Sequence, residues 1–295
     1  MRSLINHFNR YKFVLSELVK KGIVLRYRRS YLGIFWSLLE PLLTSVVLYF
    51  VFSAVLGRGG TPEHQLKVYG QLSFMVYILA GRLLYSFYNQ TTKECTRVIR
   101  TNAALIKKVH IPKYLFPLSH LIFNYILFLI SLIVLVVVGG VMMASGLQPF
   151  PTTRILLSFI PLINLILFAW GSSLILATLG TFFRDLEYLW NVFMTLMFYA
   201  CAIFYPINKI QQSSYPWVAY FMKANPLYCI ITNFRQCIAG SGDFIYRTTK
   251  AGKDIMEAVQ FNYYYALYSL AASLILIGIG ALVFRKNQDR FILYV

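Results

Sequence analysis

Acidic side chains are scarce in this chain. Its 295 residues contain only 10 Asp and Glu, against 28 Lys and Arg. Charged residues of both signs make up 13% of the sequence, whereas hydrophobic residues make up 58% and the mean hydropathy is +0.62. Soluble globular domains carry about 25% charged residues, so that class is excluded. The composition predicts a polytopic membrane protein.

The sequences that usually mark catalytic or nucleotide-binding sites are also missing. There is no G-x-x-x-x-G-K-[ST] loop to hold ATP phosphates, no G-x-S-x-G turn and no H-E-x-x-H pair, and the four histidines are scattered. Asp185 and Glu187 form a pair of acids, which a turn or helix cap explains better than catalysis. We expect no catalytic residue, metal site or bound cofactor in this chain, so that any uphill movement would draw on a partner or an ion gradient.

Four cysteines occur without C-x-x-C spacing, which gives no sign of a metal site or redox pair. They are interpreted as isolated thiols, with a Cys229–Cys237 pairing left open. The net charge of +18 raises nucleic acid as a partner. However, the basic residues gather between apolar segments and at the ends of the chain, as in loops that face anionic lipid. Membrane lipid, and not nucleic acid, is the predicted partner.

Six apolar segments are long enough to cross a bilayer, which takes about 20 helical residues. Lys and Arg concentrate before the first segment, in the 93–113 loop and after the last segment. The positive-inside bias therefore places both termini and this loop in the cytoplasm, and 208–263 outside. No linker or repeat divides the chain, which predicts one all-α transmembrane domain over 1–295. Its predicted spans are 31–57, 66–92, 114–146, 154–182, 187–207 and 264–284.

Residues 4–25 have apolar positions at helical spacing with polar and basic residues between them. This pattern predicts an amphipathic helix in the cytoplasmic membrane interface. A flexible basic tail is the alternative.

Two ionisable residues stand inside predicted spans, where charge is costly. Counting about 1.5 Å per residue places Glu40 and Arg82 at nearly the same depth on the first two antiparallel spans. Two interpretations stay open: a buried ion pair, or side chains that line a polar conduit. Pro41 should kink the first span, and neighbouring groups should then satisfy the carbonyl that it frees.

Aromatic residues make up 17% of the chain and cluster near span ends. An interfacial belt explains most of them. The 198–205 cluster is too long for a belt alone, and aromatic rings suit sugars, which present C–H faces and hydroxyls together. The candidate path residues are Tyr85, Tyr88, Phe198, Tyr199, Phe204 and Tyr205, together with Glu40 and Arg82.

Five blocks, in order along the chain, resemble the membrane subunit of ABC-2 type exporters. Within that family they are most similar to permeases for cell-surface polysaccharides, including O-antigen and teichoic acid exporters. The blocks are RYRRSYLGIFWSLLEPLL (26–43), NAALIKKVHIPKYLFPLSHLI (102–122), FFRDLEYLW (182–190), FYPI (204–207) and NPLYCIITNFRQCI (225–238).

The resemblance implies a homodimer of six-helix subunits that binds two copies of a separate ATPase, which would hold ATP and Mg²⁺. It implies an interface helix at 4–25, a turn at Leu32–Gly33, a cytoplasmic coupling helix at 97–111 and outer re-entrant helices at 214–240. The stretch after 240 is longer than in simpler members, and an extra outer element or a mobile loop is expected there.

Two sets of site residues follow from the same resemblance. The coupling set is Arg97, Arg100, Asn102, Leu105, Ile106, Lys107 and Lys108, for which a lipid headgroup contact is the alternative. Guanidinium groups suit phosphate oxygens, and the predicted lipid-pyrophosphate set is Arg26, Arg28, Arg29, Leu32 and Gly33. The arginines also serve as topology determinants.

The leading hypothesis is export of a polyprenyl-pyrophosphate-linked polysaccharide across the bacterial plasma membrane. The alternatives are an ABC-2 exporter of drugs or small lipids, an integral-membrane enzyme that modifies glycans or lipids, and a membrane scaffold. An enzyme should have clustered acids or histidines at an interface, and here only Asp185 and Glu187 lie together.

Overall fold

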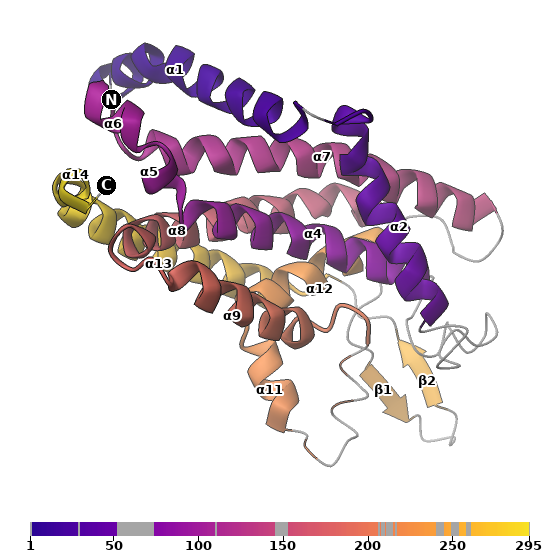
Figure 1. Ribbon diagram of the computed structural model, residues 1–295. Helices are drawn as coiled ribbons and strands as arrows, with labels where there is room; N and C mark the ends of the chain where they lie inside the picture. The colour runs from indigo at the N-terminus through magenta and orange to yellow at the C-terminus, as the bar shows by residue number, and fades with distance from the viewer. Residues whose placement is uncertain are drawn as a thin grey trace.

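The chain forms an elongated bundle of helices (Figure 1). The computed structural model describes residues 2–28, 30–51, 74–109, 111–144, 153–205, 207, 210, 215, 217–239, 245–248, 254–257 and 261–294. The predicted site residue Arg29 and residues 52–73 of the predicted first loop and its flanking spans lie outside the described residues.

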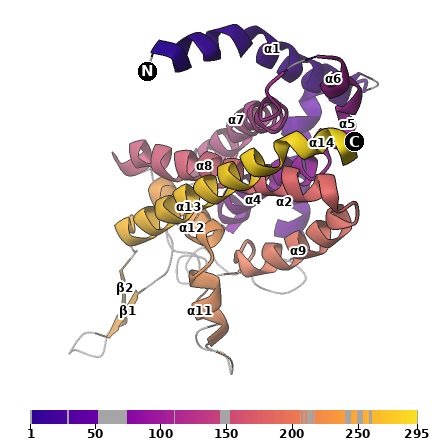
Figure 2. The same ribbon diagram turned by 90° about the vertical axis from the view of Figure 1, so that its left-hand side faces the viewer.

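The N-terminal helix α1 (Arg2–Tyr27) lies obliquely across α7 (Leu115–Ala144), as Figures 1 and 2 show from two sides. Val19 of α1 is buried against Phe123 and Leu127 of α7. The chain then turns at Gly33, whose φ of +52° is the left-handed conformation that glycine adopts most easily. A 3-10 turn, η1 (Gly33–Phe35), leads into α2 (Trp36–Phe50).

Two long helices, α4 (Phe74–Cys95) and α8 (Phe159–Phe182), pack beside α7, and a third, α13 (Tyr263–Asn287), packs against α8. A 3-10 turn, η3 (Thr153–Ser158), precedes α8. The backbones of α8 and α13 approach so closely at Gly171 and Gly280 that a Cβ on Gly280 would lie 2.7 Å from the Gly171 carbonyl oxygen. Asn164 Nδ2 donates to the Ala266 carbonyl oxygen at 3.0 Å. Small residues and interhelical hydrogen bonds of this kind hold membrane helices together.

By length and composition, four helical segments among the described residues are candidate membrane spans: Gly33–Phe50, Leu115–Val141, Ile155–Phe182 and Tyr263–Arg290. They correspond to four of the six predicted spans. The other two predicted spans coincide with α4, whose described part carries Arg82, Lys93 and Glu94, and with α9 (Leu186–Ala200), which has only 15 residues. The chain is an integral membrane protein.

Short elements occupy both ends of the bundle (Figure 1). One end carries α5 (Val98–Thr101), α6 (Ala103–Lys108), a 3-10 turn η4 (Gln288–Arg290) and α14 (Phe291–Tyr294). Toward the other end lie α11 (Trp217–Lys223), α12 (Pro226–Ala239) and an antiparallel ribbon of β1 (Ile245–Thr248) and β2 (Asp254–Glu257), in which Ile245 pairs with Glu257.

Two sequence predictions need correction. The coupling segment is not one helix over 97–111, because α5 and α6 are separated at Asn102. The helix predicted to reach 207 ends at Ala200, and Ala202 just after it has a φ of +49°. The predicted all-α class is confirmed by the described residues, in which the short ribbon is the one non-helical element, and this ribbon falls in the stretch where an extra element was one expectation.

Candidate functional site

A polar groove of about 510 Å³ runs between α2, α4 and α9. On α4, Arg82, Ser86, Asn89 and Lys93 recur at intervals of three and four residues, which places them on one helical face. Opposite them, α9 contributes Asn191, Thr195, Phe198 and Tyr199, and α2 contributes Glu40. The groove therefore offers hydrogen-bonding groups, two cations and one carboxylate beside aromatic rings.

Glu40 and Arg82 meet at this groove, as depth counting predicted, and both also line a second cavity of about 480 Å³. Their side chains make no ion pair within 4.0 Å among the described contacts. The direct ion pair is therefore absent from the described residues, and the conduit interpretation stays a prediction.

Pro41 explains a hydrogen bond between α2 and α7. Proline has no N–H to give to the carbonyl four residues earlier, which is that of Ser37. Ser131 Oγ of α7 donates to this carbonyl oxygen at 2.8 Å. The prediction that a neighbour satisfies the freed carbonyl is confirmed, and Pro41 thereby creates an attachment point for α7.

Aromatic rings continue from the groove to the end of α9. The Tyr85 ring lies 5.2 Å from that of Phe198, Phe198 lies 5.7 Å from Phe204, and Phe204 lies 5.1 Å from Tyr205. Tyr199 joins this aromatic chain through Phe204, at 5.6 Å. These distances are typical of interacting rings.

Tyr88, the remaining predicted path residue, does not join the aromatic chain. It is buried on the far side of α4, stacks on Phe168 at 5.1 Å and lies 3.0 Å from the Ser172 hydroxyl. Tyr88 lines a different, apolar cavity beside α8. Its role in the structure is to hold α4 against α8.

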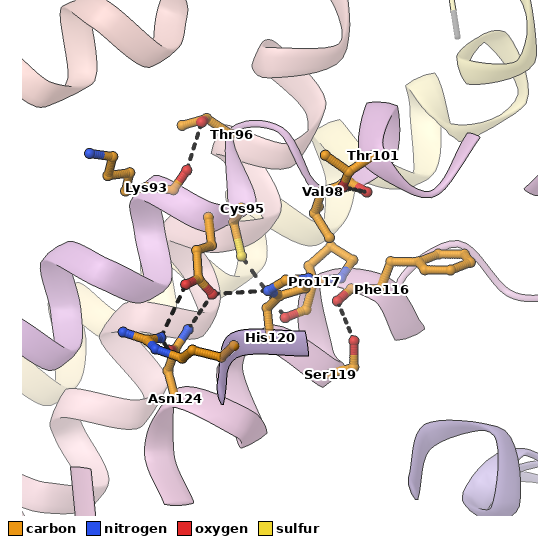
Figure 3. Close-up of polar contacts among 12 residues, drawn as sticks. Lys93, Cys95, Thr96, Val98, Thr101, Phe116, Pro117, Ser119, His120 and Asn124 are labelled. Atoms are coloured by element: carbon orange, nitrogen blue, oxygen red, sulfur yellow. Dashed lines mark hydrogen bonds and ion pairs between the residues drawn. The ribbon is translucent and has the colours of Figure 1, made fainter. Parts of the chain in front are cut away.

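The predicted pyrophosphate set begins at a partly buried polar cluster around His120 and Asn124 (Figure 3), in which Glu94 is the main acceptor. Asn124 Nδ2 donates to Glu94 Oε2 at 2.8 Å, His120 Nδ1 lies 3.0 Å from the same oxygen, and Arg26 Nη1 lies 3.3 Å from Oε1. Arg26 also donates to Asn124 Oδ1 at 3.2 Å. Arg26 is thus committed to a carboxylate that joins α1 to α4 and α7, whereas Arg28 and Leu32 are exposed.

Glu94 lies beyond the predicted end of the second span, and its pKa is shifted by opposing causes. Burial raises the pKa, but the hydrogen bonds and positive charges of His120, Asn124 and Arg26 outweigh it and hold the pKa below the usual value. The ionised carboxylate is therefore the form that stabilises this end of the bundle.

Replacing Glu94 with glutamine is expected to lower the free energy of unfolding at pH 7 by about 1–3 kcal/mol, since charged hydrogen bonds are lost. A lowered folded pKa means that the contribution is complete above the unfolded pKa of about 4.3 and is lost as pH falls through the folded value. Thermal unfolding of wild type and Glu94→Gln should therefore converge below about pH 4. The control is Glu17→Gln, which breaks an exposed pair with Lys20. Equal deficits at every pH would contradict the prediction.

The coupling residues divide between a buried face and an exposed face. Val98, Ile99 and Ile106 are buried together with Phe116 and Phe291. Lys107 and Lys108 are exposed, Leu105 is half-buried, and Asn102 Nδ2 donates to the Val98 carbonyl oxygen at 2.8 Å between α5 and α6. Arg97 Nη1 lies 3.3 Å from Glu187 Oε1 at the start of α9, and Arg100 lies between the two faces.

The C-terminal turn is part of this coupling region, which the sequence analysis did not foresee. Phe291 is fully buried, with its ring 5.2 Å from that of Phe284. Lys113 Nζ donates to the Gln288 carbonyl oxygen at 2.5 Å. Sequence patterns gave no signal for this contact, because 175 residues separate Lys113 from Gln288.

A buried cation was also missed. Arg235 of α12 is 1% exposed and contacts both Tyr77 of α4 and the turn after α9. Only Glu40 and Arg82 had been counted as charges inside the bundle, because Arg235 falls in the segment assigned to the outer loop. Arg235 is the one charged residue of α12, and this isolated charge next to Phe234 was the available signal.

Comparison with known proteins identifies the family of the chain. The profile of the ABC-2 type transporter family matches residues 14–238. The chain belongs to this family. The ABC-2 chain is also similar, at 28% identity over 283 residues, to the O-antigen export system permease protein RfbA of Klebsiella pneumoniae, with 94% of this chain and 93% of that protein covered.

Two further relatives of this ABC-2 chain cover most of its length. The RfbA protein of Myxococcus xanthus is 27% identical over 235 residues, which are 80% of this chain and 84% of that protein. The polysialic acid transport protein KpsM of Escherichia coli is 20% identical over 279 residues, which are 94% of this chain and 95% of that protein.

Proposed function

We propose that this ABC-2 chain is the permease subunit of an ATP-driven exporter of cell-surface polysaccharide. Its cargo would be a polyprenyl-pyrophosphate-linked glycan of O-antigen, capsule or teichoic acid type, moved from the cytoplasm across the bacterial plasma membrane. The observation that carries the proposal is the groove between α4 and α9, where amides, hydroxyls and charges lie beside a continuous aromatic chain. Sugars offer hydroxyls and C–H faces that match both kinds of group.

The proposed assembly is a homodimer with six spans per subunit, cytoplasmic termini and re-entrant α11 and α12 on the outer side. The groove is bordered by α2 and α9, whose outward side chains are large and apolar. Such a surface calls for lipid or a second copy of the chain. The exposed residues on these two helices include Leu43, Val47, Phe50, Tyr188, Leu189, Val192 and Leu196.

Energy would come from two copies of a separate ATPase that binds ATP and Mg²⁺. Its contact would be the exposed face of α6, with Lys107 and Lys108, because the opposite face is anchored in the bundle. Motion of this anchored segment would then reach α8 and α13 directly. The pyrophosphate would bind near Arg28 and the 480 Å³ cavity that Arg26 and Arg82 line.

The first experiment asks what accompanies the chain when it is tagged and extracted from its native membrane in mild detergent. A stoichiometric P-loop ATPase is the expected companion. A pure chain without an ATPase would overturn the exporter proposal and return the enzyme and scaffold alternatives.

The second experiment replaces Phe198 with alanine and measures the glycan at the cell surface. Phe198 links the groove to the outer rings, so the variant should reduce surface glycan at least tenfold while it still assembles with the ATPase. The control on the same helix is Phe193→Ala, which removes a ring of the same size that lines the apolar cavity beside α8 and not the groove. Normal surface glycan in Phe198→Ala would contradict a path along this groove.

A further inference from the structure

Arg235 is a fully buried cation in an unusual environment. No carboxylate lies within ion-pair distance of it in the part of the chain that the structure describes. Instead its guanidinium donates three hydrogen bonds to backbone carbonyl oxygens, from Nε to Tyr77 at 3.1 Å, from Nη1 to Ala202 at 3.1 Å and from Nη2 to Ile203 at 2.9 Å. Its Cζ atom also lies 3.6 Å from the centre of the Tyr77 ring. A desolvated charge is costly, so all of these contacts are needed to hold it.

Two of the three carbonyls that Arg235 binds, those of Ala202 and Ile203, belong to a turn that the backbone does not favour. Ala202 has a φ of +49°, a left-handed conformation that a residue with a Cβ adopts at a cost. The carbonyls at the C-terminus of α9 also carry the negative end of the helix dipole, which a cation stabilises. Arg235 therefore supplies both the hydrogen bonds and the charge that this turn, Cys201–Tyr205, requires.

Tyr77 binds the same turn from α4. Its hydroxyl donates to the Ala202 carbonyl oxygen at 3.2 Å and to the Tyr205 carbonyl oxygen at 3.1 Å. Tyr77 of α4 and Arg235 of α12 thus both hold the beginning of the turn, at Ala202, and Tyr77 also holds its end, at Tyr205.

Gly81 provides the space for the guanidinium. A Cβ at this position of α4 would lie 2.0 Å from Arg235 Nη2. Gly81 lies one helical turn after Tyr77 on the same face of α4. The Tyr77 ring and the space beside Gly81 therefore both accommodate the guanidinium of Arg235. Three residues are therefore needed for this arrangement: Tyr77, Gly81 and Arg235.

The turn carries the outer end of the aromatic chain. Phe204 lies within 5.7 Å of Phe198 and 5.1 Å of Tyr205, ring centre to ring centre. Any shift of the turn would break the continuity of rings that begins at Tyr85 in the groove. Arg235 consequently helps to set the position of Phe204 relative to the groove through the backbone carbonyls of Ala202 and Ile203.

We propose that Arg235 is a positioning residue for transport: it locks the Cys201–Tyr205 turn onto α4 and α12 and so fixes the outer end of the substrate groove. The effect on transport rests on the proposed function, whereas the lock, that is the contacts by which Arg235 holds the Cys201–Tyr205 turn, does not depend on it. Lysine cannot replace arginine here, because a single ammonium cannot reach three carbonyls and stack on a ring at the same time.

The test compares wild type, Arg235→Lys, Tyr77→Phe and Cys237→Ala in the complete transporter. Cys237 is buried on the same helix but lies in a different cluster, so its variant controls for altered packing of α12. Hydrogen exchange of peptides that cover 199–205 should be at least tenfold faster in Arg235→Lys and faster in Tyr77→Phe, and unchanged in Cys237→Ala. This readout requires no cargo.

The amount of glycan exported per ATP hydrolysed is the second readout. Arg235→Lys should lower it at least tenfold while assembly with the ATPase and basal hydrolysis stay at the wild-type level. If Arg235→Lys exchanges and transports like wild type, or if Cys237→Ala matches it in both readouts, the positioning role is wrong. Faster exchange in Arg235→Lys together with a wild-type chain that exports no glycan would overturn the proposed function and leave the lock intact.

Discussion

Replacing Gly180 with alanine is expected to be among the most damaging single-methyl changes in the chain. The added Cβ would lie 1.8 Å from the Thr96 carbonyl oxygen and 2.7 Å from the Thr96 carbonyl carbon. Both atoms are backbone, so no side chain can rotate away, and α8 must move off the turn that follows α4. Overpacking of this kind costs about 3 kcal/mol and more than offsets the gain in helix propensity.

The expected result for Gly180→Ala is a lower thermal unfolding midpoint and a weaker complex with the ATPase, because Thr96 lies only two residues before the start of α5. The matched control is Gly278→Ala on α13, where an added Cβ would meet nothing within 4 Å. An unchanged midpoint in Gly180→Ala, or an equal loss in both variants, would show that the close approach of α8 to Thr96 does not exist in the membrane.

Replacing Phe291 with alanine is expected to remove the C-terminal turn from the coupling region. The side chain is fully buried and its ring lies 5.2 Å from Phe284 and 6.1 Å from Phe182. Emptying such a site costs about 3–5 kcal/mol. Because Val98, Ile99 and Ile106 belong to the same cluster, α5 and α6 should lose their anchor along with stability.

Two measurements check this expectation for Phe291→Ala. The unfolding midpoint should fall, and hydrogen exchange in α5 and α6 should rise while exchange in the central part of α7 does not change. Leu282→Ala removes an exposed apolar side chain of α13 and is the control. A lower midpoint without faster exchange in α5 and α6 would mean that Phe291 supports the bundle but not the coupling helices.

Runs of hydrophobic residues predicted the spans well where the limits of a helix are set by the residues of that helix itself. The predicted spans at 114–146, 154–182 and 264–284 correspond to α7, to η3 with α8, and to α13. The last of these begins where Asn262 accepts hydrogen bonds from the backbone N–H groups of Tyr264 and Tyr265 as an N-cap. Such signals are local, and a sequence contains them.

The sequence predicted how deep in the bundle the site residues lie, but not the direction in which each side chain points around its helix axis. Counting residues placed Glu40 and Arg82 at one level, and both line one groove, yet the helices do not turn the two charges into contact. Tyr88 lies only three residues after Tyr85 but faces α8 instead. A span predicted from hydropathy carries no information on which face meets which neighbour.

The contacts that were missed are tertiary. Arg26 and Glu94 are 68 residues apart, and Arg235 is 158 residues from Tyr77. Neither pair follows a periodicity, and each becomes visible only when helices are assembled. The turn at Ala202 was missed for a related reason, since its backbone conformation depends on Arg235 and not on local propensity.

The burial of the thiols makes this chain suited to site-directed labelling. All four cysteines, Cys95, Cys201, Cys229 and Cys237, are buried. Burial raises the pKa of the Cys95 thiol to about 12, which leaves almost none of the reactive thiolate at neutral pH. A maleimide fluorophore or nitroxide should therefore attach selectively to one cysteine introduced on the exposed face of α6, with the native sequence otherwise intact. In the proposed homodimer, distances between the two copies of such a probe would then follow α5 and α6 through a cycle of ATP hydrolysis.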